Sequence, residues 1–189
     1  VLRDFKRRYP GVRLQITNHS TPQAIAALRS GLVELAVVGT PCGEIDAPLN
    51  EQRLRTFRDL LVAGPDYAYL AQQKLTYSEI ARLPMISLGP DSSTHAFYAQ
   101  LFAEHGAMLE PDIQTATTDQ ILPLVCYGMG LAFVPEDFAR EAIAQKEVVC
   151  LQMETPPPPR YISLVKDKSR PLSVAAMELE RMLREASAQ

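Results

Sequence analysis

The chain has 189 residues, of which 47% are hydrophobic and 22% are charged. This composition is typical of a soluble globular protein and excludes a disordered or fibrous one, while the length allows one large domain or two small ones. Its 19 basic and 22 acidic residues give a net charge of -3, whereas a region that binds nucleic acid by itself usually carries a basic excess.

No apolar run approaches the roughly 18 residues of a membrane span, and the first eight residues, VLRDFKRR, do not resemble a secretion signal. We therefore expect a cytoplasmic protein with no membrane partner. The three cysteines, Cys42, Cys126 and Cys150, are odd in number and widely spaced. This spacing predicts neither a disulfide framework nor a zinc knuckle.

The first forty residues alternate between helix and strand patterns. Apolar residues at helical spacing predict a helix over 1–9, and the alternation of Val12, Leu14 and Ile16 predicts a strand. A second helix is expected from Pro22, capped by Ser20 or Thr21. The apolar run 35–38 follows as a strand covered on both sides. Two strands joined by a helical crossover predict a parallel pair.

The same alternation continues to the C-terminus. Strands are expected at 60–63, 85–88, 113–117, 131–134, 148–151 and 161–165, and helices at 78–83, 95–105, 119–127, from 135, and at 174–186. Strands that alternate with helices over this length predict an α/β protein with mostly parallel sheets.

Five segments, in this order, resemble the effector-binding domain of LysR-type transcriptional regulators. They are FKRRYPGVRL (5–14), LRSGLVELAVV (28–38), EIARLPMI (79–86), TDQILPLVCYGMGLAFVP (118–135) and RYISLVKD (160–167). The resemblance implies two Rossmann-like lobes in a type-2 periplasmic-binding-protein-like fold, joined by two crossover strands. Lobe I would comprise 1–60 and 166–189, and lobe II 61–165.

The same resemblance implies a function. A small-molecule effector would bind in the cleft between the lobes and modulate DNA binding and transcription by a full-length homodimer or higher homo-oligomer. The family's winged helix-turn-helix would precede Val1, so DNA would be contacted only through a domain that this chain lacks. The alternative is a periplasmic solute-binding protein of the same fold class, which an upstream secretion signal would support.

Two polar loops are the candidate effector site, because ligands of α/β sheets lie at strand ends, beside helix N-termini. By the resemblance, the two loops face each other across the cleft. The first is formed by Asn18, His19, Ser20 and Thr21, and the second by Asp91, Ser92, Ser93, Thr94 and His95. The expected site is completed by Gly39, Thr40, Pro41, Thr118, Phe133 and Pro135.

The chemistry of these loops suits a carboxylate or another anion of modest size, because hydroxyl groups can donate to it. The carboxylate of Asp91 argues against a strongly anionic ligand in direct contact with the second loop. His19 and His95 could add positive charge below neutral pH. Other interpretations stay open: the Ser and Thr residues could be helix caps, the histidines could have no role, and Phe133 could pack in the core.

Other chemistries find little support. Gly128 and Gly130 lack the third glycine of a dinucleotide fingerprint, and no Walker lysine motif occurs. The three histidines have no metal-ligand spacing. Cys126 lies in an apolar stretch typical of a buried thiol, which leaves Cys42 as the one cysteine to test as a redox switch. We therefore expect no metal, no cofactor and no enzymatic activity.

Overall fold

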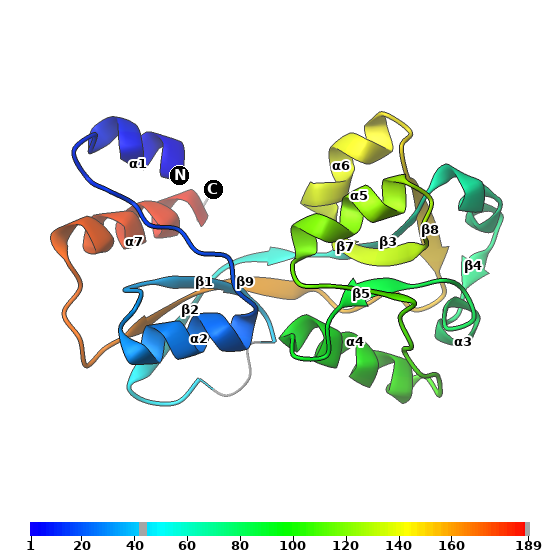
Figure 1. Cartoon of the computed structure of the whole chain (residues 1–189), viewed down its shortest axis with the longest axis horizontal. Helices are drawn as coiled ribbons and strands as arrows, with labels where there is room; N and C mark the ends of the chain where they lie inside the picture. The colour runs from blue at the N-terminus through cyan, green and yellow to red at the C-terminus, as the bar shows by residue number, and fades with distance from the viewer. Residues whose placement is uncertain (42–44, 188–189) are drawn as a thin grey trace. The chain divides into compact units, whose positions relative to one another are not determined.

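A computed structural model of the chain describes residues 1–41 and 45–187 (Figure 1). The chain forms two compact units: unit 1 comprises Val1–Thr56 and Tyr161–Gln189, and unit 2 comprises Phe57–Arg160. Residues 57–60 therefore belong to unit 2 and residues 161–165 to unit 1, which moves the boundaries expected at 60 and 166. The reason is strand pairing, because 59–63 pairs with strands of unit 2, and 162–165 with a strand of unit 1.

Unit 1 is built on a three-stranded sheet. Its strands, in sheet order, are β1 (Ala36–Gly39), β9 (Arg160–Asp167) and β2 (Leu49–Phe57). Helix α2 (Thr21–Ser30) packs Ile25 and Leu28 against Ala36 and Val38 of β1. Gly31 ends this helix with a left-handed backbone, φ 76°, which glycine adopts without steric cost.

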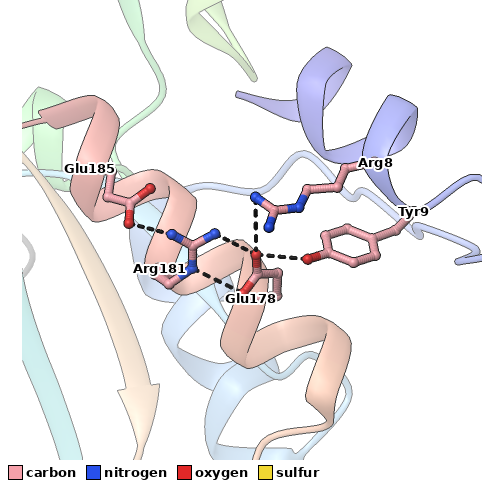
Figure 2. Close-up of polar contacts among 5 residues, drawn as sticks. All are labelled: Arg8, Tyr9, Glu178, Arg181 and Glu185. Carbon is pink, nitrogen blue, oxygen red and sulfur yellow. Dashed lines mark hydrogen bonds and ion pairs between the residues drawn. The ribbon is translucent and has the colours of Figure 1, made fainter.

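The terminal helices of unit 1, α1 (Leu2–Arg8) and α7 (Val174–Ser187), lie together on the side of the sheet opposite α2 (Figure 1). Phe5 of α1 is fully buried. The end of α1 is joined to α7 at Glu178, whose carboxylate accepts from the Tyr9 hydroxyl at 2.8 Å (Figure 2). Arg181, which lies on α7 itself, donates its Nε to the same carboxylate at 3.0 Å.

Unit 2 contains a mixed sheet. Four strands, β4 (Lys74–Leu75), β8 (Val149–Met153), β3 (Asp59–Ala63) and β7 (Leu131–Pro135), follow one another in that order. The two further strands, β5 (Ile86–Leu88) and β6 (Ile113–Thr115), pair in parallel. A bridge between Met85 and Leu131 links β5 to β7, and the Leu131 N–H donates to the Pro84 carbonyl at 2.8 Å.

Two hydrophobic cores lie on opposite faces of this sheet, because successive side chains of a strand point to opposite sides. Leu61 and Phe133 belong to the first core and Val62 and Val134 to the second. The first core is covered by α3 (Tyr77–Ile80) and α4 (Ser93–Glu104), and the second by α5 (Ile121–Cys126) and α6 (Glu136–Ala144). The 3₁₀ segments η1 (Pro65–Gln72) and η2 (Thr118–Gln120) complete the unit.

The structure corrects three expectations about strands. Residues 12–20 form no helix or strand, and Ile16 is 70% exposed, because none of the described residues offers this segment a pairing strand. Val37 is 53% exposed, so the 35–38 run is not covered on both sides. The sheets are not mostly parallel either, since β3 runs antiparallel to both β7 and β8, and β1 antiparallel to β9.

Candidate functional site

The second predicted loop lies where two parallel strands end. Leu88, the last residue of β5, pairs with Thr115, the last residue of β6, and the Gly89 N–H donates to the Thr115 carbonyl at 3.0 Å. Helix α4 begins four residues later, at Ser93. The loop therefore has the position expected of a ligand site in an α/β sheet, at the carboxyl end of its strands.

The first turn of α4 brings the predicted hydroxyl residues together. Ser92 is the N-cap, and its buried Oγ accepts from the His95 N–H at 3.0 Å. Ser93 and Thr94 are therefore the first two residues of the helix, where backbone N–H groups have no partner within the helix. Sequence periodicity predicts that this helix starts at about His95, two residues later than it does, because Ser and Thr do not extend the apolar pattern.

His95 is held by the backbone that precedes the loop. Its Nδ1 lies 3.0 Å from the Leu88 carbonyl oxygen, and since a carbonyl can only accept, this nitrogen carries the proton. The ring is half-buried. His95 thus fixes the loop to β5.

Thr94 contacts a residue that the sequence did not single out. Arg160 Nη2 donates to Thr94 Oγ1 at 2.7 Å, and Arg160 Nη1 lies 2.9 Å from Asp59 Oδ2. The Tyr98 hydroxyl donates to the same Asp59 oxygen at 2.7 Å. Arg160 and Asp59 are 6% and 8% exposed, so this ion pair is buried beside the predicted effector loop.

Aromatic rings enclose the Arg160 guanidinium. The centroids of Phe97, Phe57 and Tyr98 lie 5.1, 5.2 and 6.0 Å from its central carbon. Burial, with the Asp59 carboxylate as second cause, raises the pKa of Tyr98 well above its usual value, so this hydroxyl stays a donor at neutral pH. In sequence, Arg160 and Asp59 look like surface charges at strand starts, and no local pattern distinguishes them.

The first predicted loop, in unit 1, is partly assembled. Ser20 is the N-cap of α2, and its backbone N–H donates to Gln23 Oε1 at 3.2 Å. The Ser20 Oγ is buried and has no hydrogen-bond partner among the described residues. Thr21 Oγ1 lies 3.5 Å from the Gly39 carbonyl, a weak bond that nevertheless places the start of α2 beside the end of β1.

The other predicted site residues of unit 1 are exposed to different degrees. Thr40 is anchored, because its Oγ1 accepts from the Tyr161 N–H and its own N–H donates to the Tyr161 carbonyl, both at 2.8 Å. Asn18, His19 and Pro41 are exposed. Cys42 follows directly and lies outside the described residues. The strand-end residues of unit 1 thus gather around Thr21, Gly39 and Thr40.

The three other predicted residues of unit 2 have structural roles of their own. Phe133 is 8% exposed and stacks on Tyr98 at 4.4 Å between ring centroids, so its side chain packs in the core. Pro135 is the N-cap of α6 and pairs with Asp59 in the β3–β7 register. Thr118 begins η2, on the loop that leaves β6, and is half-buried.

Three other kinds of feature bear on function in the described part of the chain: metal sites, membrane spans and reactive thiols. Residues 1–41 and 45–187 hold no group of three or more His, Cys, Asp or Glu side chains that could bind a metal. Within the same residues, every helix is too short or too polar to cross a membrane. Burial is the main cause that raises the pKa of both the Cys126 and the Cys150 thiol, which disfavours reactive thiolates there.

A charged groove of about 680 Å³ lies along α7 in unit 1. Several of its charges are paired, because Lys166 pairs with Glu180 at 2.7 Å and Arg184 pairs with the same carboxylate. Arg170 lies 3.5 Å from Asp167.

Solved structures define the class of this fold. The regulatory domain of CcmR from Synechocystis PCC6803, in complex with 2-PG, matches with a TM-score of 0.85 at 19% identity, covering 98% of this chain and 88% of that one. The fold is thus that of the regulatory domains of LysR-type regulators, a type-2 periplasmic-binding-protein-like α/β fold, as expected from the sequence.

The family follows from the sequence match. The LysR substrate binding domain family matches residues 1–188, so the chain belongs to this family. It is a LysR-type effector-binding domain, and the alternative of a periplasmic solute-binding protein is not favoured. The relatives that support this assignment are transcriptional regulators and not enzymes.

Two relatives illustrate the range of matches. The chain is 24% identical over 183 residues to the HTH-type transcriptional regulator CbbR of Rhodospirillum rubrum, covering 97% of this chain and 60% of that protein. It is 30% identical over 179 residues to a protein of Anaeromyxobacter dehalogenans named phosphonates import ATP-binding protein PhnC, covering 93% of this chain and 35% of that protein. The chain thus spans at most about three-fifths of either relative, and it contains no Walker motif that would fit the second name.

Proposed function

We propose that this chain senses a small anion, such as a carboxylate or a phosphate ester, for a transcriptional regulator. The observation that carries the proposal is the N-terminus of α4, where Ser93 and Thr94 place two hydroxyl groups beside unpaired helix N–H groups. A helix N-terminus favours negative charge, and hydroxyls add directional donors. The helix is 12 residues long, and Ser92 caps it with one side-chain bond.

The loop of unit 1 is the second proposed contributor. Ser20 and Thr21 stand at the N-terminus of the ten-residue α2, beside Gly39 and Thr40 at the end of β1. The buried and unpartnered Ser20 Oγ supports a ligand role, because a buried hydroxyl without a partner costs free energy that a bound ligand would recover. Of the other predicted residues, Asn18, His19, Pro41, Asp91, Thr118 and Pro135 are retained as proposed neighbours of the ligand.

Regulation of DNA binding is proposed for the complete protein. CbbR of Rhodospirillum rubrum is a transcriptional regulator that is longer than this chain, which supports a longer protein here as well. We infer that such a protein binds DNA through another domain, acts as a homodimer or larger homo-oligomer, and works in the cytoplasm. The effector would shift its equilibrium between states by binding one state more tightly than the other.

The proposal is tested by titrating the chain calorimetrically with 2-PG, inorganic phosphate and a panel of small carboxylates. Binding of at least one of these anions is expected, together with a rise in the unfolding midpoint at saturating ligand. Ser93→Ala removes one proposed donor and should weaken that binding without unfolding the chain. If no anion of the panel binds the unaltered chain, the proposed ligand class is wrong.

A further inference from the structure

Arg160 occupies an unusual place for a cationic side chain. It is 6% exposed, it stands at the first position of β9, and the rings of Phe57 and Phe97 lie against its guanidinium. A buried charge is costly unless it is paired and hydrogen-bonded. The hydrogen bonds of this guanidinium therefore indicate the role of the arginine.

Asp59 already neutralises the charge of Arg160. The Asp59 Oδ2 atom lies 2.9 Å from Arg160 Nη1 and also accepts from the Tyr98 hydroxyl. The bond from Arg160 Nη2 to Thr94 Oγ1, at 2.7 Å, adds no charge compensation, because a threonine hydroxyl is neutral. This hydrogen bond therefore mainly affects the hydroxyl group of Thr94.

That consequence is a choice between donating and accepting. A hydroxyl group has one proton and two lone pairs, whereas a guanidinium can only donate. When Arg160 donates to Thr94 Oγ1, the hydroxyl proton must point to a different partner, and a cationic donor strengthens the hydroxyl's own donation. Thr94 is half-buried in the first turn of α4, so its proton is available beside the helix N-terminus.

We propose that Arg160 is a positioning residue that holds the Thr94 hydroxyl as a hydrogen-bond donor to an anionic or carbonyl oxygen of the effector. The inference rests on the proposed function, because Thr94 must touch the ligand. It deepens that function by naming the ligand group that Thr94 meets: an oxygen acceptor, and not an ammonium or amide donor. Arg160 itself makes no contact with the ligand.

The test is a double-mutant cycle on the 189-residue chain, with binding of 2-PG, or of the tightest anion in the panel, measured calorimetrically. Arg160→Lys keeps the charge but cannot reach both Asp59 and Thr94 with a planar fork. It should weaken binding about tenfold, and Thr94→Val should weaken binding by at least as much. In the Thr94→Val background, Arg160→Lys should change the affinity by less than about twofold, since Arg160 acts through Thr94.

Two controls separate positioning from general damage. Arg140→Lys makes the same change at an exposed arginine that pairs with Asp137 in unit 2, and it should leave the affinity unchanged. Thr94→Ser keeps the hydroxyl and should bind within about threefold of the unaltered chain, whereas Thr94→Val should not. This serine and valine pair keeps the test open if Arg160→Lys fails to fold.

The outcomes are distinguishable. The positioning role would be overturned if Arg160→Lys bound with wild-type affinity. It would also be overturned if the losses of binding free energy from Arg160→Lys and Thr94→Val added fully in the double variant. Neither result would contradict the proposed function. If Arg160→Lys does not fold, equal binding by Thr94→Ser and Thr94→Val would overturn it. If the unaltered chain binds no anion of the panel, the proposed function fails, and this inference fails with it.

Discussion

Buried hydroxyl groups in unit 2 differ in what they contact, and the difference can be measured. Tyr98 and Tyr77 belong to the same core cluster and are 3% and 2% exposed. The Tyr98 hydroxyl donates to Asp59 at 2.7 Å, whereas the Tyr77 hydroxyl has no partner among the described residues. Burial raises the pKa of Tyr77 to about 12, so both residues are neutral phenols at physiological pH.

Tyr98→Phe should therefore destabilise the chain by about 1–3 kcal/mol, because a buried carboxylate loses a donor. Urea unfolding followed by circular dichroism measures the difference. The matched control is Tyr77→Phe, which removes an unpartnered hydroxyl from the same core and should leave the free energy of unfolding unchanged or slightly higher. Equal losses in the two variants would mean that the bond to Asp59 contributes nothing specific.

At this scale the sequence located the polar loops but not the residue that supports them. Ser92, Ser93 and Thr94 were recognisable as cap-type residues after an apolar strand. Arg160 and Asp59 are 101 positions apart, and a long-range pair of this kind leaves no trace in a single sequence. Phe133 shows the opposite difficulty, because an aromatic residue in an apolar run fits both a ligand wall and a core.

At the scale of elements, the end of β3 packs closely against the end of α5. A Cβ atom placed on Gly64 would lie 2.6 Å from the Val125 carbonyl oxygen and 2.9 Å from Gly128 Cα. Both neighbours are backbone atoms, which cannot turn away as a side chain does. Gly64 therefore allows the connection from β3 to η1 to pass directly beneath α5.

Gly64→Ala should destabilise the chain by about 1–3 kcal/mol through this overlap. Gly11→Ala is the control, since a Cβ there meets nothing within 4 Å, and this variant should be neutral or more stable by up to about 1 kcal/mol. Denaturant midpoints of the two variants give the comparison. A Gly64→Ala variant as stable as Gly11→Ala would mean that α5 moves freely relative to β3.

The contact between α1 and α7 makes a prediction about pH. Hydrogen bonds from Arg181 and then from Tyr9 lower the pKa of Glu178 from 4.5 to about 2 (Figure 2). Because the folded state holds this proton less tightly than the unfolded state, the stabilisation is complete above pH 4.5 and is lost as the pH falls towards 2. The Glu178 side chain is 22% exposed, so salt will weaken the effect only in part.

Glu178→Gln should accordingly flatten the decline of the unfolding midpoint between pH 4.5 and 2, when urea titrations are compared across that range. Glu141→Gln is a suitable control, because Glu141 accepts a bond from the neutral Gln145 side chain on the exposed face of α6. If Glu178→Gln and the unaltered chain decline in parallel, the link between α1 and α7 does not contribute to acid stability.

Helices and strands were predicted correctly where the apolar pattern of the sequence agrees with the packing and strand pairing of the fold. Most helices and the buried strands of unit 2 were expected within a few residues, because their apolar periodicity matches what they bury. Residues 12–16 have the alternation of a strand, yet a strand forms only when a second one pairs with it. Conversely, β2 (Leu49–Phe57) was missed, because its sequence LNEQRLRTF carries five charged or amide side chains and little apolar alternation.

For the whole molecule, the open question is whether both units contribute to ligand binding. Ser20 allows an answer from unit 1. Its Oγ is buried without a full hydrogen bond in the described residues, although Ser20 and Gln23 form a capping box, so its removal costs the fold no more than a helix cap. A loss of affinity in a Ser20→Ala variant that is still folded would then reflect a bond made to the ligand.

Ser20→Ala should lower the free energy of unfolding by no more than about 1 kcal/mol, the usual value of a helix cap, while it weakens binding of the panel's tightest anion about tenfold. Ser30→Ala is the matched control at the other end of α2, where the hydroxyl donates to the Ala27 carbonyl at 3.0 Å. This control should bind with wild-type affinity. Unchanged binding by Ser20→Ala, together with a loss in Ser93→Ala, would restrict the site to unit 2, and the Ser20 hydroxyl would then be an unsatisfied group that the fold simply tolerates.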